Sequence, residues 1–351
     1  MKTPGAIIVC VLILCGGCLK PSPYSSTYNI PATYNFYNVN DTAQLVLLAM
    51  ADQLTARINL ANTTGTTVSA QVLTDMFNNR NGYFNDSTLK LNASGVKLAN
   101  YCAPSAQTDL LNYFDSIGTY SQSATAVTAG YLLSPNGVYY SEVIQKTLIS
   151  GILTYTIDTY LADSIGDNID NINIIPGYGT LMEHVWDEAF GLFGVPIDFP
   201  ADTQHLRYLG YYSNLVDSGL QSNATLMTAF ITGRAAITSN DMGTKQAQAT
   251  QVVTTLEQLE AASLIHELNA ADKYVQGGNQ AAANAALSAA LGFMRGLGYD
   301  NSPSRIITGA QLTQLVTLFG TGNLYAGVNT EAIRQALAGI YGFTASQLTT
   351  F

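Results

Sequence analysis

The sequence predicts an all-α, bundle-like fold for the body of the protein. Apolar residues recur every three or four positions over long stretches, and Gly, Pro, Asn or Asp clusters separate those stretches. No sustained run of alternating residues bounded by hairpin signals is present, which argues against a sheet. The spacing predicts helices at about 42–60, 69–79, 105–121, 136–165, 180–194, 203–218, 224–238, 241–275, 279–296, 308–320 and 329–341.

The first seventeen residues have the features of an export signal. Lys2 precedes an apolar run, residues 6–14, which is too short to span a bilayer but suits the core of a signal peptide. Two glycines stand directly ahead of Cys18, and small residues there are what a lipoprotein signal peptidase needs. We therefore expect removal of residues 1–17 and lipidation of Cys18. Cys15 stands where Leu is usual, so a plain secretory signal is the alternative.

Lipidation would place the protein in the cell envelope. Leu19 is not the Asp that retains many lipoproteins at an inner membrane, so we expect an outer-membrane lipoprotein that faces either the periplasm or the surface. Cys102 is then the one unmodified thiol, which excludes an intramolecular disulfide. A packed core must supply the stability, and the hydrophobic content of 47% is ample for it.

Residues 18–40 are expected to form the lipidated cysteine and a tether. Three prolines stand there among Ser, Asn and Tyr, without a helical period, and order is expected to begin near Pro31. The character changes at Asp41, a good N-cap residue, behind which apolar residues recur at helical spacing. Residues 41–351 are predicted to form one helical domain, with halves at about 41–200 and 201–351 if an internal repeat is real.

The charge of the chain limits its partners. The formal net charge is −10, and loss of Lys2 with the signal peptide takes it to about −11. Such a body is repelled by nucleic acid and by anionic lipid, so we expect no nucleic-acid partner and a membrane attachment through the lipid anchor. A net negative charge would also attract cations. Charged residues are only 11% of the chain, however, and ordinary solubility explains the net charge more simply.

The stretch that begins at Thr180 is the most informative for chemistry. Thr180 and Glu183 have the spacing of a capping box, so Glu183 is interpreted as structural. On the helix that follows, His184, Asp187 and Glu188 share the face opposite the apolar residues. An imidazole with carboxylates three and four residues later can begin a site for iron or another divalent metal. The competing interpretation is a solvated face whose His and acids pair across one helical turn.

A metal site needs ligands from other helices, and His266 is a candidate. It follows Val252 and Leu256 at helical spacing, so it is expected to point inward. The alternative for His266 is a hydrogen-bonded core residue. His205, near a predicted helix start, is interpreted as a surface or capping residue.

The chain lacks the signatures of common enzyme classes. It contains no Walker A loop, no Rossmann glycine pattern, no HExxH, no paired CxxC and no GxSxG elbow. An enzyme, and a peptidase in particular, is therefore not expected. Tyrosines gather at Tyr208, Tyr211 and Tyr212, where they could form a sticky surface, although tyrosines at helical spacing more often lie in the core with the hydroxyl at its rim.

Four stretches of the chain, 31–36, 136–146, 182–194 and 324–333, resemble a family of bacterial surface lipoproteins of unknown function, distant relatives of the imelysin-like, iron-regulated proteins. The resemblance spans nearly the whole mature chain. It implies a compact all-α fold of two related helical-bundle halves and a metal role, because the imelysin relatives share a Gly-x-His-x-x-Glu motif suspected of binding iron.

The motif transfers only in part. His184 takes the His position and Asp187 the acidic position, with Glu188 beside it, but Met182 stands where the motif has Gly. In the second half the related proteins resemble His-x-x-Ser-Glu-x-x-Gly-Phe. Ala285 and Ala289 replace the His and the Glu there, although residues 285–293 otherwise align with residues 184–192.

Two functions are therefore expected from the sequence. The first is a lipid-anchored envelope binding protein that acts in metal or iron binding or uptake, with His184, Asp187, Glu188 and His266 as ligands. The alternative is a metal-free interaction protein that docks another envelope protein or a glycan through its tyrosine-rich patches.

Overall fold

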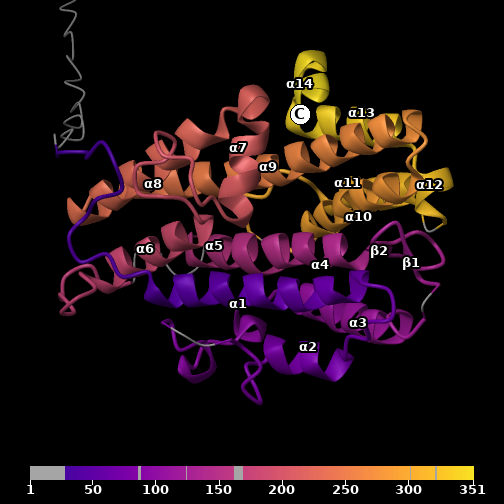
Figure 1. Ribbon diagram of the computed structural model, residues 1–351. Helices are drawn as coiled ribbons and strands as arrows, with labels where there is room; N and C mark the ends of the chain where they lie inside the picture. The colour runs from indigo at the N-terminus through magenta and orange to yellow at the C-terminus, as the bar shows by residue number, and fades with distance from the viewer. Residues whose placement is uncertain (1–27, 86–87, 124, 162–168, 301, 321) are drawn as a thin grey trace, which may run out of the picture.

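The computed structural model describes residues 28–85, 88–123, 125–161, 169–300, 302–320 and 322–351, and these form an all-α body (Figure 1). The predicted fold class is confirmed. The predicted signal peptide and Cys18 lie outside the described residues. The α-helices are α1 (Thr42–Asn59), α2 (Ala70–Phe77), α3 (Pro104–Tyr120), α4 (Tyr140–Leu148), α5 (Tyr155–Thr159), α6 (Leu181–Phe193), α7 (Tyr208–Leu220), α8 (Ser222–Thr238), α9 (Met242–Gln276), α10 (Gln280–Gly296), α11 (Gly309–Phe319), α12 (Leu324–Gly327), α13 (Thr330–Tyr341) and α14 (Ala345–Thr350).

Short elements join these helices. Three are 3-10 turns, η1 (Leu60–Asn62), η2 (Leu91–Ala93) and η3 (Leu98–Tyr101), and a fourth, η4 (Ile149–Thr154), is π-helical. Strands β1 (Val127–Thr128) and β2 (Tyr131–Leu132) pair antiparallel. This small hairpin was not predicted, because two-residue strands are too short to produce an alternating pattern.

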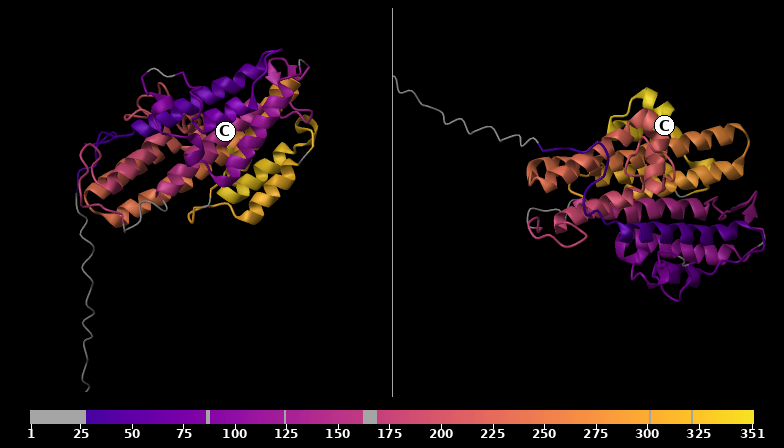
Figure 2. Two further views of the ribbon diagram at one scale, coloured as in Figure 1. Left: turned by 90° about the horizontal axis from the view of Figure 1, so that it is seen from below. Right: turned by 60° about the vertical axis from the view of Figure 1, so that its left-hand side comes forward.

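The long helix α9 organises one side of the body. It packs along α8 and α10, and α10 packs in turn on α4. α4 lies on α1, with α2 and α3 on the far side of that layer (Figures 1 and 2). α9 suits this position because side chains around most of its circumference are apolar or small and buried, from Val252 to Leu268.

Glycines let the central helices approach closely. A Cβ added to Gly292 of α10 would lie 2.5 Å from the Lys146 Cβ and 3.1 Å from the Val143 carbonyl oxygen, both on α4. A Cβ added to Gly233 of α8 would lie 2.0 Å from Cζ2 of Trp186. The absence of a side chain at these positions therefore sets how near α10 lies to α4 and α8 to α6.

The predicted helix 136–165 is divided. The described part begins at Tyr140 and contains the π-helical turn η4 between α4 and α5. A π turn holds one more residue than an α turn, which changes the direction of every side chain that follows. Thr154 thereby reaches α9, where its hydroxyl donates a 2.7 Å hydrogen bond to Oε1 of Glu260.

Most predicted helix bounds agree closely with the structure. The predicted helix 203–218 begins only at Tyr208, because His205 has a positive φ angle of 59° that does not fit the interior of a right-handed helix. His205 itself is exposed, as predicted. Within the described residues, no helix is both long and apolar enough to span a bilayer.

Candidate functional site

The start of α6 is built as the sequence predicts. Thr180 and Glu183 exchange both hydrogen bonds of a capping box. This box satisfies two backbone N–H groups at the start of the helix and fixes where the helix begins. Glu183 also pairs with Arg234 of α8, with Nη1 and Oε1 2.6 Å apart.

Asp187 lies in the interior of the protein. The prediction placed Asp187 beside His184 on the face away from the core, whereas the structure buries it fully. Its Oδ1 accepts a 2.7 Å hydrogen bond from the Tyr34 hydroxyl and lies 2.8 Å from Nε of Arg234. Burial raises the pKa of Asp187 to about 6, and the Arg234 guanidinium and the Tyr34 hydroxyl oppose that rise. Asp187 therefore joins α6 to α8 and to the segment ahead of α1.

His184 and Glu188 form a pair across one turn of α6. Nε2 of His184 lies 3.6 Å from Oε1 of Glu188, and the side chain of Gln44 donates a 2.9 Å hydrogen bond to the same oxygen. The ring of Tyr178 meets the imidazole edge to face, with centroids 4.6 Å apart. Nδ1 of His184 is buried without a hydrogen-bond partner. The competing interpretation expected this pairing across one turn, but not the burial: the two side chains are only 19% and 17% exposed, so the face is not a solvated one.

The structure does not bring the four proposed metal ligands together. In the described part of the chain, no group of three His, Cys, Asp or Glu side chains is placed to hold a metal ion. His266 lines a pocket that His184, Asp187 and Glu188 do not line. Nδ1 of His266 lies 2.8 Å from the Phe351 carbonyl oxygen, which can only accept, so Nδ1 carries the proton in the neutral ring.

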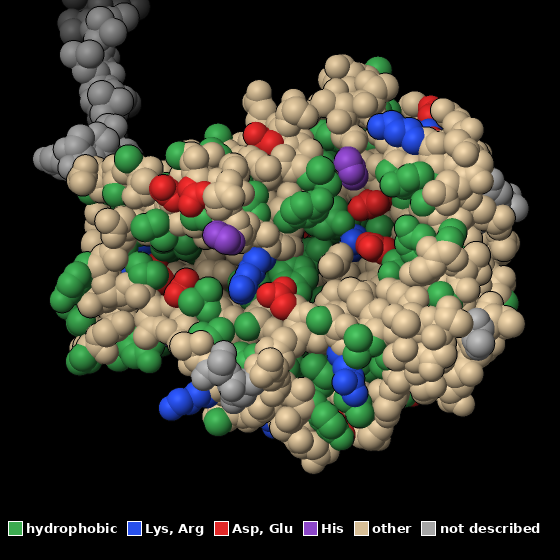
Figure 3. Space-filling view, viewed as in Figure 1, with side chains coloured by type: hydrophobic (Ala, Val, Ile, Leu, Met, Phe, Trp, Pro, Cys, Tyr) green, Lys and Arg blue, Asp and Glu red, His purple; other side chains and the backbone are tan. Residues whose placement is uncertain are grey.

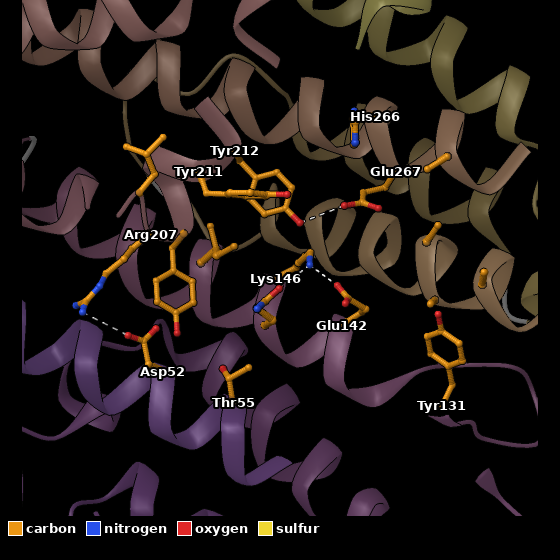
Figure 4. Close-up of a pocket in the computed structure, with 18 of the residues that line it drawn as sticks. Asp52, Thr55, Tyr131, Glu142, Lys146, Arg207, Tyr211, Tyr212, His266 and Glu267 are labelled. Carbon is orange, nitrogen blue, oxygen red and sulfur yellow. Dashed lines mark hydrogen bonds and ion pairs between the residues drawn. The ribbon is translucent and has the colours of Figure 1, made fainter. Parts of the chain in front are cut away.

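The pocket that His266 lines lies between α4, α7, α9 and α10, with part of α1 at its edge (Figure 4). Its volume is about 680 Å³, within the range of pockets for small molecules. Figure 3 shows the hollow on this face of the molecule, with acidic and basic side chains inside it. We call it the tyrosine pocket; its lining residues are Asp52, Thr55, Tyr131, Glu142, Gln145, Lys146, Ile149, Leu206, Arg207, Tyr208, Tyr211, Tyr212, His266, Glu267, Ala270, Tyr274, Ala282, Ala285 and Ala286.

A buried ammonium lies at the floor of the tyrosine pocket. Nζ of Lys146 contacts a carboxylate oxygen of Glu142 and donates a 2.8 Å hydrogen bond to Oε1 of Gln145. The same nitrogen lies 5.3 Å from the centroid of the Tyr212 ring, a cation–π distance. Lys146 is therefore held by α4 on one side and by an aromatic ring of α7 on the other.

Glu267 of α9 supplies a second carboxylate to this floor. The Tyr212 hydroxyl donates a 3.1 Å hydrogen bond to Oε1 of Glu267 (Figure 4). Burial raises the pKa of Glu267, and the positive charge of Lys146 opposes the rise. Glu142 and Glu267 thus supply carboxylate oxygens from two different helices to one polar floor.

Aromatic rings form much of the wall. Tyr131, Tyr208, Tyr211, Tyr212 and Tyr274 all line the pocket. The rings of Tyr211 and Tyr212 meet edge to face, with centroids 5.3 Å apart. The wall therefore offers apolar ring faces together with hydroxyl groups that donate and accept hydrogen bonds.

The formal charges of the acidic and basic side chains in the pocket nearly cancel. Asp52, Glu142 and Glu267 face Arg207 and Lys146, and Nη2 of Arg207 lies 3.8 Å from Oδ2 of Asp52. Such a balance favours a neutral or zwitterionic ligand over a strongly charged one.

Small side chains of α10 keep the pocket open on its fourth side. Ala282, Ala285 and Ala286 line it there.

Some residues of this site are predicted from the sequence and others are not. The cluster of tyrosines at 208, 211 and 212 was recognised as a candidate surface, and His266 as a candidate ligand. Glu142, Lys146 and Glu267 were not predicted as site residues. Glu142 and Lys146 have the i, i+4 spacing of a helical ion pair, but that pattern is common on exposed faces and does not by itself indicate a pocket.

Comparison with known proteins identifies a family for this chain but no activity. Residues 31–344 match the family model described as a domain of unknown function (DUF4856). No curated protein and no solved structure matches the chain.

Proposed function

Because the chain belongs to this family of unknown function, we propose a function from the pocket itself: the protein is a lipid-anchored envelope protein that binds a small saccharide in the tyrosine pocket. The proposal takes up the glycan-docking alternative from the sequence. It includes a distant relationship to the imelysin-like proteins, but not their metal chemistry.

One observation carries the saccharide proposal. Five tyrosines line one pocket whose floor holds the buried ammonium of Lys146 and the carboxylates of Glu142 and Glu267, which come from two helices. Sugar hydroxyls both donate and accept hydrogen bonds, so they can pair with Glu142 and Glu267 as acceptors and with Lys146 as a donor. The apolar faces of sugar rings fit against tyrosine rings. The near balance of charge suits a neutral sugar.

The metal-binding alternative has less support from the geometry. Oδ1 of Asp187 is engaged by Arg234 and Tyr34, and although its Oδ2 has no hydrogen-bond partner, no group of three His, Cys, Asp or Glu side chains among the described residues is placed to hold a metal ion. His184 and Glu188 alone supply two ligands, fewer than a stable transition-metal site needs.

Placement in the envelope rests on the N-terminal sequence. Lipidation of Cys18 would hold the acidic body at an outer membrane through acyl chains, with no need for a basic surface. This part of the proposal is tested by mass spectrometry of the protein extracted from cell membranes. An acylated N-terminal Cys18 is expected, and a soluble protein that starts at another residue would contradict it.

Saccharide binding is tested by isothermal titration calorimetry with a panel of neutral mono- and oligosaccharides. Glu267→Gln replaces a charged acceptor by a neutral one and should weaken binding about tenfold, the effect of losing one hydrogen bond to a charged group. Tyr211→Ala should also weaken it, because it removes a half-exposed ring from the wall.

Tyr83→Ala is the matched control. Tyr83 is exposed to a similar degree as Tyr211 but does not line the pocket, so its loss should leave affinity unchanged. If no saccharide binds the wild type, or if binding survives both pocket substitutions undiminished, the proposal is wrong.

A further inference from the structure

The loop ahead of α6 presents apolar side chains to solvent. Ile172 and Ile174 are 86% and 71% exposed, and Ile175, Tyr178 and Leu181 are also exposed. We call residues 172–181 the apolar loop. Single exposed apolar residues are common on protein surfaces, but five within ten residues form a patch that calls for a partner.

Polar side chains at the base of the apolar loop hydrogen-bond to backbone groups. The Asp170 carboxylate accepts hydrogen bonds from the backbone N–H groups of Ile172 and Asn173, at 2.8 and 3.0 Å. Asn171 donates a 2.9 Å hydrogen bond to the Ile237 carbonyl oxygen, at the end of α8. Polar side chains thus brace the backbone at the base of the apolar loop, while its apolar side chains stay exposed.

The apolar loop is also held in shape. The N–H of Ile175 donates a 2.7 Å hydrogen bond to the Gly179 carbonyl oxygen, which closes the tip. The Thr180 hydroxyl donates a 2.7 Å hydrogen bond to Oδ1 of Asn171. These bonds fix the isoleucines outward, so little ordering is needed when they meet a partner.

The position of the loop indicates which partner that is. The described chain starts at Tyr28, and this start lies at the same end of the body as the loop ahead of α6 (Figures 1 and 2). Cys18 precedes Tyr28 by ten residues, which span at most about 35 Å when fully extended. An acyl chain on Cys18 would therefore keep this end of the body within about that distance of the bilayer.

We infer that the apolar loop inserts its isoleucines into the surface of the bilayer that holds the lipid anchor, and so fixes the orientation of the body. This inference rests on the proposed lipidation of Cys18. Residues 169–181 contain no Lys or Arg, so the contact is apolar and does not require anionic lipid. Tyr178 has the amphipathic ring that is favoured at the level of the headgroups.

The experiment separates the loop contact from lipidation. The chain from residue 18 onward, with Cys18→Ser and a His tag ahead of it, is captured on phosphatidylcholine vesicles that contain a nickel-chelating lipid. Ile174→Trp reports on the loop by fluorescence, while the native Trp186 is fully buried and supplies a constant background. We expect emission at shorter wavelength on vesicles and quenching by brominated phosphatidylcholine.

Leu60→Trp is the control. Leu60 is also exposed, but it follows the far end of α1, about 27 Å along the helix from Thr42. Its emission should not change on vesicles. The inference is overturned if the emission of Ile174→Trp is unchanged, if both variants respond equally, or if Ile174→Trp responds only when envelope protein is added. Since the chelating lipid replaces the acyl group, the result does not depend on whether Cys18 is lipidated in cells.

Discussion

Tyr34 and Asp187 are separated by 153 positions in sequence, yet the Tyr34 hydroxyl donates a 2.7 Å hydrogen bond to Oδ1 of Asp187 in the interior. The Tyr34 ring also stacks on Phe190, with centroids 3.6 Å apart. The segment ahead of α1 is thus fastened to α6 by a polar and an aromatic contact at once. Arg234 completes the cluster from α8.

Removal of the Arg234 charge should destabilise the protein strongly. Arg234→Leu leaves Asp187 buried without its counter-charge, which costs about 3–5 kcal/mol of the free energy of unfolding. Urea denaturation followed by circular dichroism measures the change. The control is Arg57→Leu, at an exposed position of α1, which should stay within about 0.5 kcal/mol of wild type. Equal effects of the two substitutions would contradict the structural role of Arg234.

Stability should depend on the protonation of Glu260. Burial raises the pKa of Glu260 to about 8, although the hydrogen bond from the Thr154 hydroxyl opposes the rise. In the unfolded chain the pKa of a Glu is about 4.3, so the folded state binds this proton more tightly. The contribution to stability is therefore complete below about pH 4 and is lost as the pH rises toward 8, up to about 5 kcal/mol in all.

Urea denaturation between pH 5 and pH 8 tests this dependence. The free energy of unfolding of the wild type should fall over that range, and Glu260→Gln should reduce the slope. Some slope should remain, because burial also raises the pKa of Asp158. Glu331→Gln is the comparison, since Glu331 is exposed and hydrogen bonds lower its pKa. A Glu260→Gln slope as steep as that of the wild type would count against the assignment.

Gly292→Ala should alter both stability and the tyrosine pocket. The added methyl group meets the Lys146 Cβ and the Val143 carbonyl oxygen, and such overpacking costs about 1–3 kcal/mol. Moving α10 away from α4 should also lower the saccharide affinity. Gly309→Ala meets nothing within 4 Å in the helix α11 and should be neutral or stabilise by about 0.4–1 kcal/mol. Thermal unfolding and calorimetry measure the two effects, and a Gly292→Ala protein like wild type in both would refute the close contact.

Cys102 should be unreactive in the folded protein. The thiol is buried, and burial raises its pKa to about 12, so almost no thiolate forms at neutral pH. With the signal peptide absent and Cys18→Ser, one thiol should react with a chromogenic disulfide reagent only after urea is added. Rapid reaction of native protein would show that Cys102 is accessible.

Local signals allowed much of the fold to be predicted. The apolar period and the capping residues lie within one helical turn of the bounds they define, as at Thr180, and such short-range patterns survive in any tertiary context. The start of α7 could not be predicted in this way, because the left-handed backbone at His205 has no distinct sequence signal.

The candidate site depends on contacts that sequence spacing does not contain. Asp187 has a suitable position for a ligand on its helix, but Arg234 lies 47 residues away and determines its role. The tyrosine pocket is assembled from Glu142, Tyr212 and Glu267 on three helices. Each alone resembles an ordinary helix-surface residue, and only their packing brings them together.

The π-helical turn η4 sets the rotational phase between two halves of one helical run. Lys146 precedes the turn and faces the tyrosine pocket, while Asp158 follows it and is buried in the interior. If residues 149–154 were wound as a regular α-helix with no residue removed, everything after them would be rotated by about 100° relative to Lys146. The π turn thus lets one helical run present Lys146 to an open cavity before the turn and Asp158 to the buried interior after it.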